Sequence, residues 1–513
     1  MSGKKLQSAA VFLAALLIIT ILWIPVSAEA SDAVAVYTAP NGFKVVSYAR
    51  TWSDINKLKS VYEELLRNTH GEEFKLLTKI NIYPGPDSQG SSTVGKWYGV
   101  WTLTNGQPHL AGNRYIDIYN GQDLTTVSSI ARTLAHEYGH HFTYYYYFKK
   151  EKKSWESWRT TGLAAARGLK SDSRVKAMTN DHNWSIEEIV AEDYVQLFGS
   201  PSAKISRRYK DLLERLHVNE TILVYSTDTF NYSPQENYRI PLASRVKGLK
   251  EYWLKASGIT DKYGSPPTPN TLQLSEVNQL NFVPTPQYVF SWTKSTDDKT
   301  AKLEYTLVCF EQTGINNYRV YPVKTVYDDE PLEAIIGAAR DSSLYVTEDV
   351  PSGLAYYVVY IKDGDGLVTS SQIFAVDFSE PLNPDTVLIS DTCIPNGLPS
   401  SPQVKVHGKQ LKFDVPPVNQ NGRVLVPLRS IFEELGADVR WDEQTQTITA
   451  QLGVTELTLH VGKDEAEING ERITLDVPPQ IKNGMTLGPL RFISEALGAE
   501  VKWNNLIQLA SIN

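Results

Sequence analysis

Cysteine is scarce in this sequence, which contains two, Cys309 and Cys393, among 513 residues. So low a count excludes a small scaffold held together by disulfides, and each domain must therefore be stabilised by its own hydrophobic core. The two thiols can form one disulfide or remain as buried free thiols. Neither lies close in the sequence to the histidine motif described below, so a metal site shared with that motif is not indicated.

An excess of positive charge is also lacking. The formal net charge is −8 at pH 7, and the basic cluster from Lys149 to Lys153 has no accompanying aromatic-basic motif. We therefore expect no nucleic-acid partner and interpret the cluster as solvated surface. Hydrophobic residues make up 42% of the chain and aromatic residues 11%, which is typical of folded protein. The length predicts about three or four domains.

Long hydrophobic runs are lacking after the N-terminal segment. The run from Ala9 to Ile24 follows Lys4 and Lys5, and it precedes Pro25 and the small residues Val26-Ser27-Ala28. This order predicts a signal peptide over residues 1–28 and a secreted or extracellular-surface protein. The run approaches the roughly 18 residues that span a bilayer, so an uncleaved membrane anchor is the rival interpretation.

Clusters of proline and glycine divide the rest of the chain. They lie at residues 263–271 and 381–402, where the chain is expected to leave regular structure. Mixed strand and helix patterns precede the first cluster, strand patterns follow it, and two similar segments close the chain. The sequence therefore predicts a multidomain protein with an α+β domain, a β-sandwich and a small α+β domain of two repeats. The predicted boundaries are 29–262, 266–380 and 404–513, with a linker at 381–403.

The C-terminal part contains an internal repeat. Residues 411–441 align without a gap with residues 473–503, at an offset of 62 residues. The shared "PLR" and "LGA" segments resemble the N-terminal domain of copper amine oxidases, a stalk-type domain of secreted proteins from Gram-positive bacteria. The resemblance implies a structural or attachment role toward cell-wall or surface components. His407 and His460 are too few for a three-histidine copper site, so we expect no tight copper binding.

The middle part consists of short strand patterns separated by turns, as in a β-sandwich. Residues 266–380 contain β-rich runs separated by turn residues and resemble a fibronectin type III domain. The segment Asp363-Gly364-Asp365-Gly366 can be considered as a calcium loop, but a hairpin turn between two strands is the favoured interpretation.

A histidine pair marks the candidate site of the first domain. The segment "HEYGH", residues 136–140, lies in a predicted helix that begins near Asp123. His136 and His140 are one turn apart on one face, so both imidazoles can reach one Zn²⁺ at about 2.0 to 2.1 Å, with Glu137 beside the metal as a general base. The alternative is that His136 and His140 are polar residues on a solvated helix face and bind no metal. His141 points elsewhere and is not expected to be a ligand.

A third ligand is expected on a second amphipathic helix over residues 184–199. Its "EIVAE" segment, together with "HEYGH", resembles the gluzincin group of zinc peptidases, which includes the thermolysin-like enzymes. The resemblance implies a zincin-like metallopeptidase domain over residues 29–262. It also implies Glu188 as the third zinc ligand, and Glu192 as an outer carboxylate that orients a zinc-bound imidazole.

Alternatives remain for these carboxylates. Ser185 and Glu188 also match a capping box, in which Glu188 would bond only to the backbone at the start of the helix. Glu187 or Glu192 could replace Glu188 as the ligand. The metzincin pattern is excluded because it requires glycine and histidine at the positions of Thr143 and Tyr146.

The resemblance implies a zinc-dependent endopeptidase acting on peptide or protein substrates, with Glu137 passing the proton of a water to the departing amine. The substrate would pair with an edge strand, either "TLTNG" at 102–106 or "KINIY" at 79–83. The competing hypothesis is a non-catalytic surface-binding or adhesive protein with a retired zincin domain. Four side chains are possible by position as donors to the reaction's oxyanion: His182, His217, Tyr225 and Tyr238.

Overall fold

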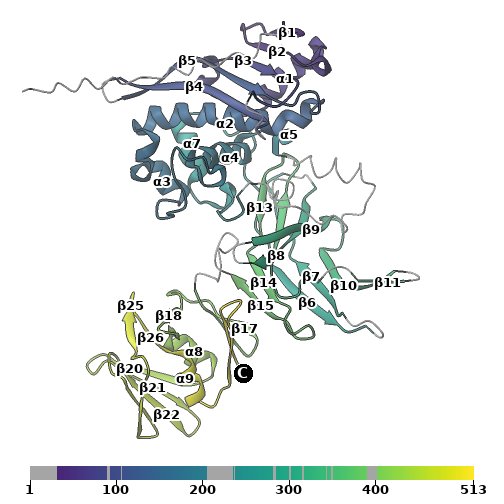
Figure 1. The fold of residues 1–513 in the computed structure, drawn as a ribbon. Coiled ribbons are helices and arrows are strands. Elements are labelled where there is room, and N and C mark those ends of the chain that lie inside the picture. The colour runs from purple at the N-terminus through teal and green to yellow at the C-terminus, as the bar shows by residue number, and fades with distance from the viewer. Residues whose placement is uncertain are drawn as a thin grey trace, which may run out of the picture.

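The computed structural model divides into three units arranged along the molecule in chain order (Figure 1). We name them the N-terminal unit (residues 32–263), the middle unit (272–389) and the C-terminal unit (401–513). The structure describes residues 32–513 except for 89–92, 105–106, 205–234, 236, 281–284, 300–301, 315–316, 342–343, 348–349 and 390–400.

The N-terminal unit is built on a five-stranded sheet with the order β1-β2-β3-β5-β4. Strands β2, β3 and β5 run parallel, while β1 and β4 are antiparallel to their neighbours. Because β3 lies inside the sheet, the prediction that "KINIY" could be a substrate-binding edge was wrong. The "TLTNG" segment begins in β4, which is an edge strand, and its Asn105-Gly106 lies outside the described residues. The strands are β1 Ala35–Thr38, β2 Lys44–Ser47, β3 Leu77–Ile82, β4 Gly95–Thr104 and β5 Gln107–Ile118.

One face of this sheet is covered by helices (Figure 1). Ile80 and Ile82 of β3 and Ile116 of β5 are fully buried in the hydrophobic core that the sheet shares with the helices. Trp97 of β4 pairs directly with Ile116, so alternation along the strand turns Gly95 and Trp97 toward the helices as well. The helices are α1 Ile55–Arg67, α2 Val127–Glu151, α3 Gly162–Arg167, α4 Ile186–Phe198, α5 Pro201–Lys204 and α7 Leu249–Ser257.

Helices α2 and α4 carry the motif residues and pack tightly on each other. Helix α2 begins after Thr126, which forms a capping box with Ser129, and not near Asp123 as predicted. A methyl group added at Gly139 would lie 2.6 Å from the carbonyl oxygen of Ala191. The glycine inside the "HEYGH" motif therefore permits the close approach that brings the α4 carboxylates to the α2 histidines.

The middle unit consists of two sheets, and side chains from both form one core. Cys309 is a free thiol buried in this core, and Cys393 lies outside the described residues. Strand β15 pairs with β14 and so belongs to the middle unit. The predicted start of the linker at residue 381 was therefore wrong, because this strand lies after it. The strands are β6 Leu272–Asn278, β7 Gln287–Trp292, β8 Glu304–Gly314, β9 Asn317–Tyr327, β10 Glu333–Asp341, β11 Leu344–Thr347, β12 Leu354–Lys362, β13 Val368–Ser370, β14 Ile373–Asp377 and β15 Asp385–Ile389.

The predicted hairpin at Asp363 is confirmed. Strands β12 and β13 are antiparallel neighbours, and Asp363 Oδ1 accepts hydrogen bonds from the backbone amides of Asp365 and Leu367 at 2.9 and 2.8 Å. Gly366 completes the turn with φ +76°, a conformation that favours glycine.

The middle unit packs directly against the N-terminal unit. Leu242 of the N-terminal unit is buried in a cluster with Val308 and Phe310 on β8. The Ser244 hydroxyl donates to the carbonyl of Val368 at 2.5 Å. Two units predicted as separate domains therefore share a hydrophobic junction.

The C-terminal unit confirms the 62-residue repeat. Strand β19 pairs antiparallel with β26, its counterpart in the second copy, so that Val426 faces Gly488, the residue aligned with it. The two copies are thus related by an approximate twofold axis at this pair. A Cβ at Gly488 would lie 2.7 Å from Leu428 Cδ2, which explains why the second copy has glycine there. The strands are β16 Gln403–Val406, β17 Lys409–Gln410, β18 Val418–Gln420, β19 Arg423–Pro427, β20 Asp438–Asp442, β21 Thr447–Leu452, β22 Thr455–His460, β23 Glu465–Ile468, β24 Glu471–Thr474, β25 Gln480–Lys482, β26 Met485–Pro489, β27 Val501–Asn504 and β28 Leu509–Ile512, and the helices are α8 Leu428–Glu434 and α9 Leu490–Ala496.

Among the described residues, no helix is both long and apolar enough to cross a membrane. The predicted signal peptide, residues 1–28, lies outside that part of the chain.

Candidate metal centre

Two helices bring the predicted ligands together. His136 and His140 lie one turn apart on α2, and Glu188 lies in the first turn of α4. The Nε2 atoms of His136 and His140 are each 3.1 Å from Glu188 Oε2. The two imidazoles of α2 therefore converge on one carboxylate oxygen of a residue 48 or more positions away in the sequence.

The two imidazole-carboxylate contacts have the spacing that a zinc ion requires. Donors bound tetrahedrally at about 2.0 to 2.1 Å from zinc are about 3.3 Å from each other, and the two imidazole-carboxylate distances of 3.1 Å are close to this value. Burial alone would raise the pKa of Glu188, but the neighbouring His140 and His136 hold it well below its usual range. Two imidazoles and an ionised carboxylate are a donor set that suits Zn²⁺.

A third histidine approaches the same carboxylate. His182 Nδ1 is 3.3 Å from Glu188 Oε2, and the His182 and His136 rings are 5.8 Å apart between centroids. The donor atoms of His136, His182 and Glu188 all lie within 4.8 Å of one another. The sequence suggested His182 only by position, as an oxyanion donor, and gave no sign that it would face the ligands.

Glu192 lies behind the ligands, one turn after Glu188. Its Oε2 is 3.5 Å from His136 Nδ1, and its Oε1 forms an ion pair with Arg132, one turn before His136 on α2. Arg132 also approaches the carbonyl of Ala203 at 3.5 Å. The arrangement places Glu192 where it can fix the imidazole orientation of His136, and it adds an arginine that the sequence did not indicate.

The capping interpretation of Glu188 was wrong. Ser185 is the N-cap residue of α4, but no side-chain capping bond is formed there. The neighbouring Glu187 takes the local bonds instead, accepting from the Ser185 hydroxyl at 2.8 Å and from the Met178 amide at 3.0 Å. Glu187 therefore points away from the histidines, and Glu188 alone of the two faces them.

Glu137 is buried beneath the edge strand β4. A methyl group at Gly95 would lie 2.9 Å from Glu137 Oε1, so the strand passes directly over the carboxylate. Burial raises the pKa of Glu137, against the opposing effects of His140, His136 and a hydrogen bond from the Trp97 backbone amide. A carboxyl group with a raised pKa beside the candidate ligands is suited to accept a proton.

Gly95→Ala should impair the site without removing a ligand. The new methyl group would lie 2.4 Å from Thr133 Cγ2 as well as against Glu137, so the carboxylate must shift. If the site is the zinc peptidase centre that the sequence predicts, peptide turnover should fall by about 10²-fold, with zinc content unchanged. Thr133→Ser removes the contacting methyl group, and the double variant should recover part of the activity. Full activity in Gly95→Ala, measured with a peptide substrate, would refute this role for the strand.

The remaining sequence candidates lie elsewhere. His141 Nε2 contacts the Glu73 carbonyl at 2.8 Å, and burial lowers the pKa of His141 to about 4, so it stays neutral. The sequence favoured a structural role for Tyr238 over that of an oxyanion donor, and its ring packs against Phe310 of the middle unit, 5.2 Å between centroids. His217 and Tyr225 lie outside the described residues.

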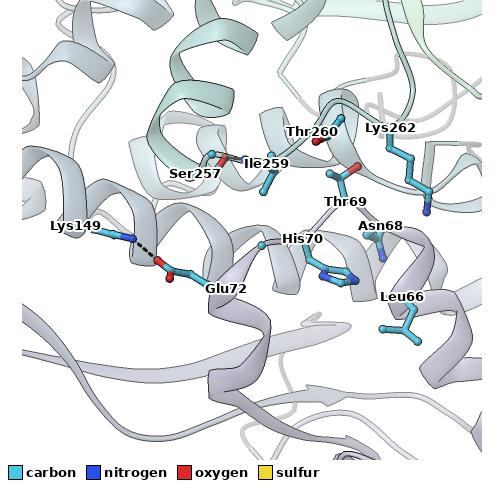
Figure 2. A pocket seen from close by; sticks show the side chains of 12 residues that line it. Leu66, Asn68, Thr69, His70, Glu72, Lys149, Ser257, Ile259, Thr260 and Lys262 are labelled. Atoms are coloured by element: carbon cyan, nitrogen blue, oxygen red, sulfur yellow. Dashed lines mark hydrogen bonds and ion pairs between the residues drawn. The ribbon is translucent and has the colours of Figure 1, made fainter.

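A polar hollow of about 610 Å³ lies at the ends of α1, α2 and α7, and its lining includes none of the candidate ligands. Figure 2 shows the Lys149–Glu72 ion pair at one end of this hollow and Lys262 at the other. A much smaller cavity of about 10 Å³ lies beside Glu188 and His182, which is room for about one water molecule. Neither hollow is a substrate cleft at the metal centre.

Comparisons with known proteins concern short parts of the chain. Residues 405–512 match the model of the copper amine oxidase N-terminal domain. A "Protease inhibitor" from Brevibacillus choshinensis is 37% identical over 78 residues, which cover 15% of this chain and 24% of that protein. The chain therefore spans about a quarter of the curated relative that it matches. The family match agrees with the repeat and its twofold arrangement, and the C-terminal unit is a copper amine oxidase N-terminal-like domain.

Proposed function

We propose that the chain is a secreted or cell-surface zinc endopeptidase whose N-terminal unit is a gluzincin-type, zincin-like domain. The observation that carries the proposal is the convergence of His136, His140 and Glu188 at 3.1 Å beside the buried Glu137. Zinc would be held by these three ligands, and when bound it would polarise a water and the scissile carbonyl.

Proton transfer would be carried out by a residue of the protein itself. Glu137, held under β4 by the Trp97 amide, accepts a proton from the attacking water and passes it to the departing amine. Its raised pKa brings it closer to neutral pH, which favours transfer in both directions. Glu192, fixed by Arg132, holds the orientation of His136.

The substrate would extend along β4. This strand lies at an edge of the sheet, and an extended peptide can pair with the backbone of an edge strand. Gly95 and Trp97 connect that edge to Glu137, so a peptide paired there would pass close to the general base.

The other units would position the enzyme. We infer that the middle unit is a fibronectin type III-like sandwich and that the C-terminal unit contributes attachment to cell-wall or surface components, as in a Gram-positive bacterium. The C-terminal unit holds only two histidines, His407 and His460, so no oxidase chemistry is proposed for it.

Metal analysis and a peptide digest test the proposal together. Residues 29–513 should bind about one zinc per chain, cleave members of a peptide library, lose that cleavage with a chelator and regain it with added zinc. His136→Ala provides the matched control, because it removes a ligand from a buried helix position without touching Glu137. Stoichiometric zinc without cleavage would favour the retired, surface-binding alternative, and absence of zinc would contradict the proposed site.

A further inference from the structure

His182 stands apart from the ligands that the motif provides. His136 and His140 project from the middle of a 25-residue helix, whereas His182 lies on the short 3-10 turn His182–Trp184 that precedes α4. Its side chain is 53% exposed, compared with 9% and 12% for His136 and His140. The turn thus presents an accessible imidazole to an otherwise buried pair.

The position of His182 matches that of a ligand. Its Nδ1 lies 3.3 Å from Glu188 Oε2, which equals the donor separation of about 3.3 Å expected around tetrahedral zinc. Neutral imidazole can bind a metal through Nδ1 as well as Nε2. The grouping of His136, His182 and Glu188 within 4.8 Å means that His182 can join the centre without any large change in the fold.

A fourth protein donor changes what the centre can do. Catalytic zinc sites keep three protein ligands and an open position, whereas sites with four protein ligands are closed. Among the described residues, the donor atoms of His136, His182 and Glu188 lie within 4.8 Å of one another, and His140 approaches the same Glu188 Oε2 at 3.1 Å. If His136, His140 and Glu188 bind the zinc, His182 is therefore placed to take a fourth position.

We propose that His182 is a fourth protein ligand that closes the zinc centre in the resting protein and must move aside before substrate is hydrolysed. The inference rests on the proposed zinc site and adds a latent state to it. The His182 side chain is 53% exposed, so a change of its rotamer is the movement that would release the ligand. The helix-borne His136 and His140 stay in place because α2 is packed against both the sheet and α4.

The competing role for His182 is that of a hydrogen-bond donor to the reaction's oxyanion. The two roles predict opposite results. Removing an oxyanion donor lowers turnover by about 10² to 10³ and leaves zinc affinity unchanged. Removing a closing ligand weakens zinc binding and leaves turnover at saturating zinc equal to or above that of the unmodified protein.

The experiment compares His182→Ala with Asn183→Ala in the full chain. Asn183 lies in the same turn, and its carbonyl, not its side chain, accepts the bond from Asn237, so its replacement controls for disturbance of the turn. Zinc affinity is measured by chelator competition, coordination by the visible spectrum of the cobalt-substituted protein, and hydrolysis at saturating zinc with one peptide from the library.

We expect His182→Ala to bind zinc at least about tenfold more weakly, to show a cobalt spectrum of altered coordination, and to hydrolyse the peptide at least as fast as the unmodified protein. Affinity and spectrum identical to those of Asn183→Ala would overturn the proposal while leaving the zinc site intact. An unmodified protein that binds no zinc would overturn the proposed function itself.

Discussion

Glu137→Gln is expected to retain about one zinc per chain while its turnover falls by about 10² to 10⁴. Glutamine has the shape of glutamate and can still accept the hydrogen bond from the Trp97 amide, but its amide cannot accept the proton of a water. The three candidate ligands are untouched. Because burial disfavours the charged form of Glu137, the variant should be no less stable than the unmodified protein.

The measurement pairs zinc analysis with hydrolysis of a single peptide, and thermal unfolding confirms the fold. A Glu137→Gln protein with normal turnover would defeat the general-base mechanism. Loss of zinc in this variant would instead make Glu137 a ligand, which its place under β4 argues against.

Glu188→Ala should behave differently, because zinc affinity and turnover are expected to fall together. The substitution removes the carboxylate oxygen that both motif histidines approach at 3.1 Å and leaves two imidazoles without a negative charge between them. A helix-capping residue would cost only about 0.5 to 2 kcal/mol of stability and would leave the metal bound.

Glu187→Ala is the matched control for this substitution. It removes the adjacent carboxylate, which bonds to Ser185 and Met178, so it should lower the free energy of unfolding by about 1 to 3 kcal/mol and retain zinc. A zinc-replete Glu188→Ala protein, or zinc loss confined to Glu187→Ala, would defeat the ligand assignment.

Local sequence patterns predicted the parts of the site that lie within single helices. His136 and His140 share a face because four residues make about one helical turn, and Glu188 and Glu192 follow the same rule. Periodicity also predicted the helices themselves, although the cap at Thr126 shifted the start of α2. The gapless repeat in the C-terminal part could be recognised directly from its matching residues, and the counterpart strands of its two copies pair with each other in the fold.

The missed features depend on how distant segments meet. His182 precedes α4 in an irregular turn, and no residue around it marks its approach to Glu188. Gly95 belongs to a strand that crosses Glu137 only after the sheet has formed. The order of strands in a sheet also depends on contacts between distant segments. The sequence therefore offered "KINIY" and "TLTNG" as equal candidates, and in the structure only "TLTNG" begins in an edge strand.

A fragment ending at Thr260 contains every candidate ligand, and the sequence alone predicts that it is active. The junction with the middle unit alters that expectation. Such a fragment would expose Leu242, which is 4% exposed in the whole chain, and it would lose Tyr263, whose hydroxyl donates to the Arg67 carbonyl and whose ring covers Lys204. The buried cluster that holds Leu242 also contains Ile507 and Leu509 of the C-terminal unit, so the middle unit contacts both of its neighbours. We therefore expect the excised fragment 29–260 to aggregate or to unfold at a lower temperature than the full chain, as measured by thermal unfolding. If the proposed activity is confirmed, the smallest stable form of the enzyme would then include the middle unit, because that unit covers apolar surface that the N-terminal unit leaves exposed on its own.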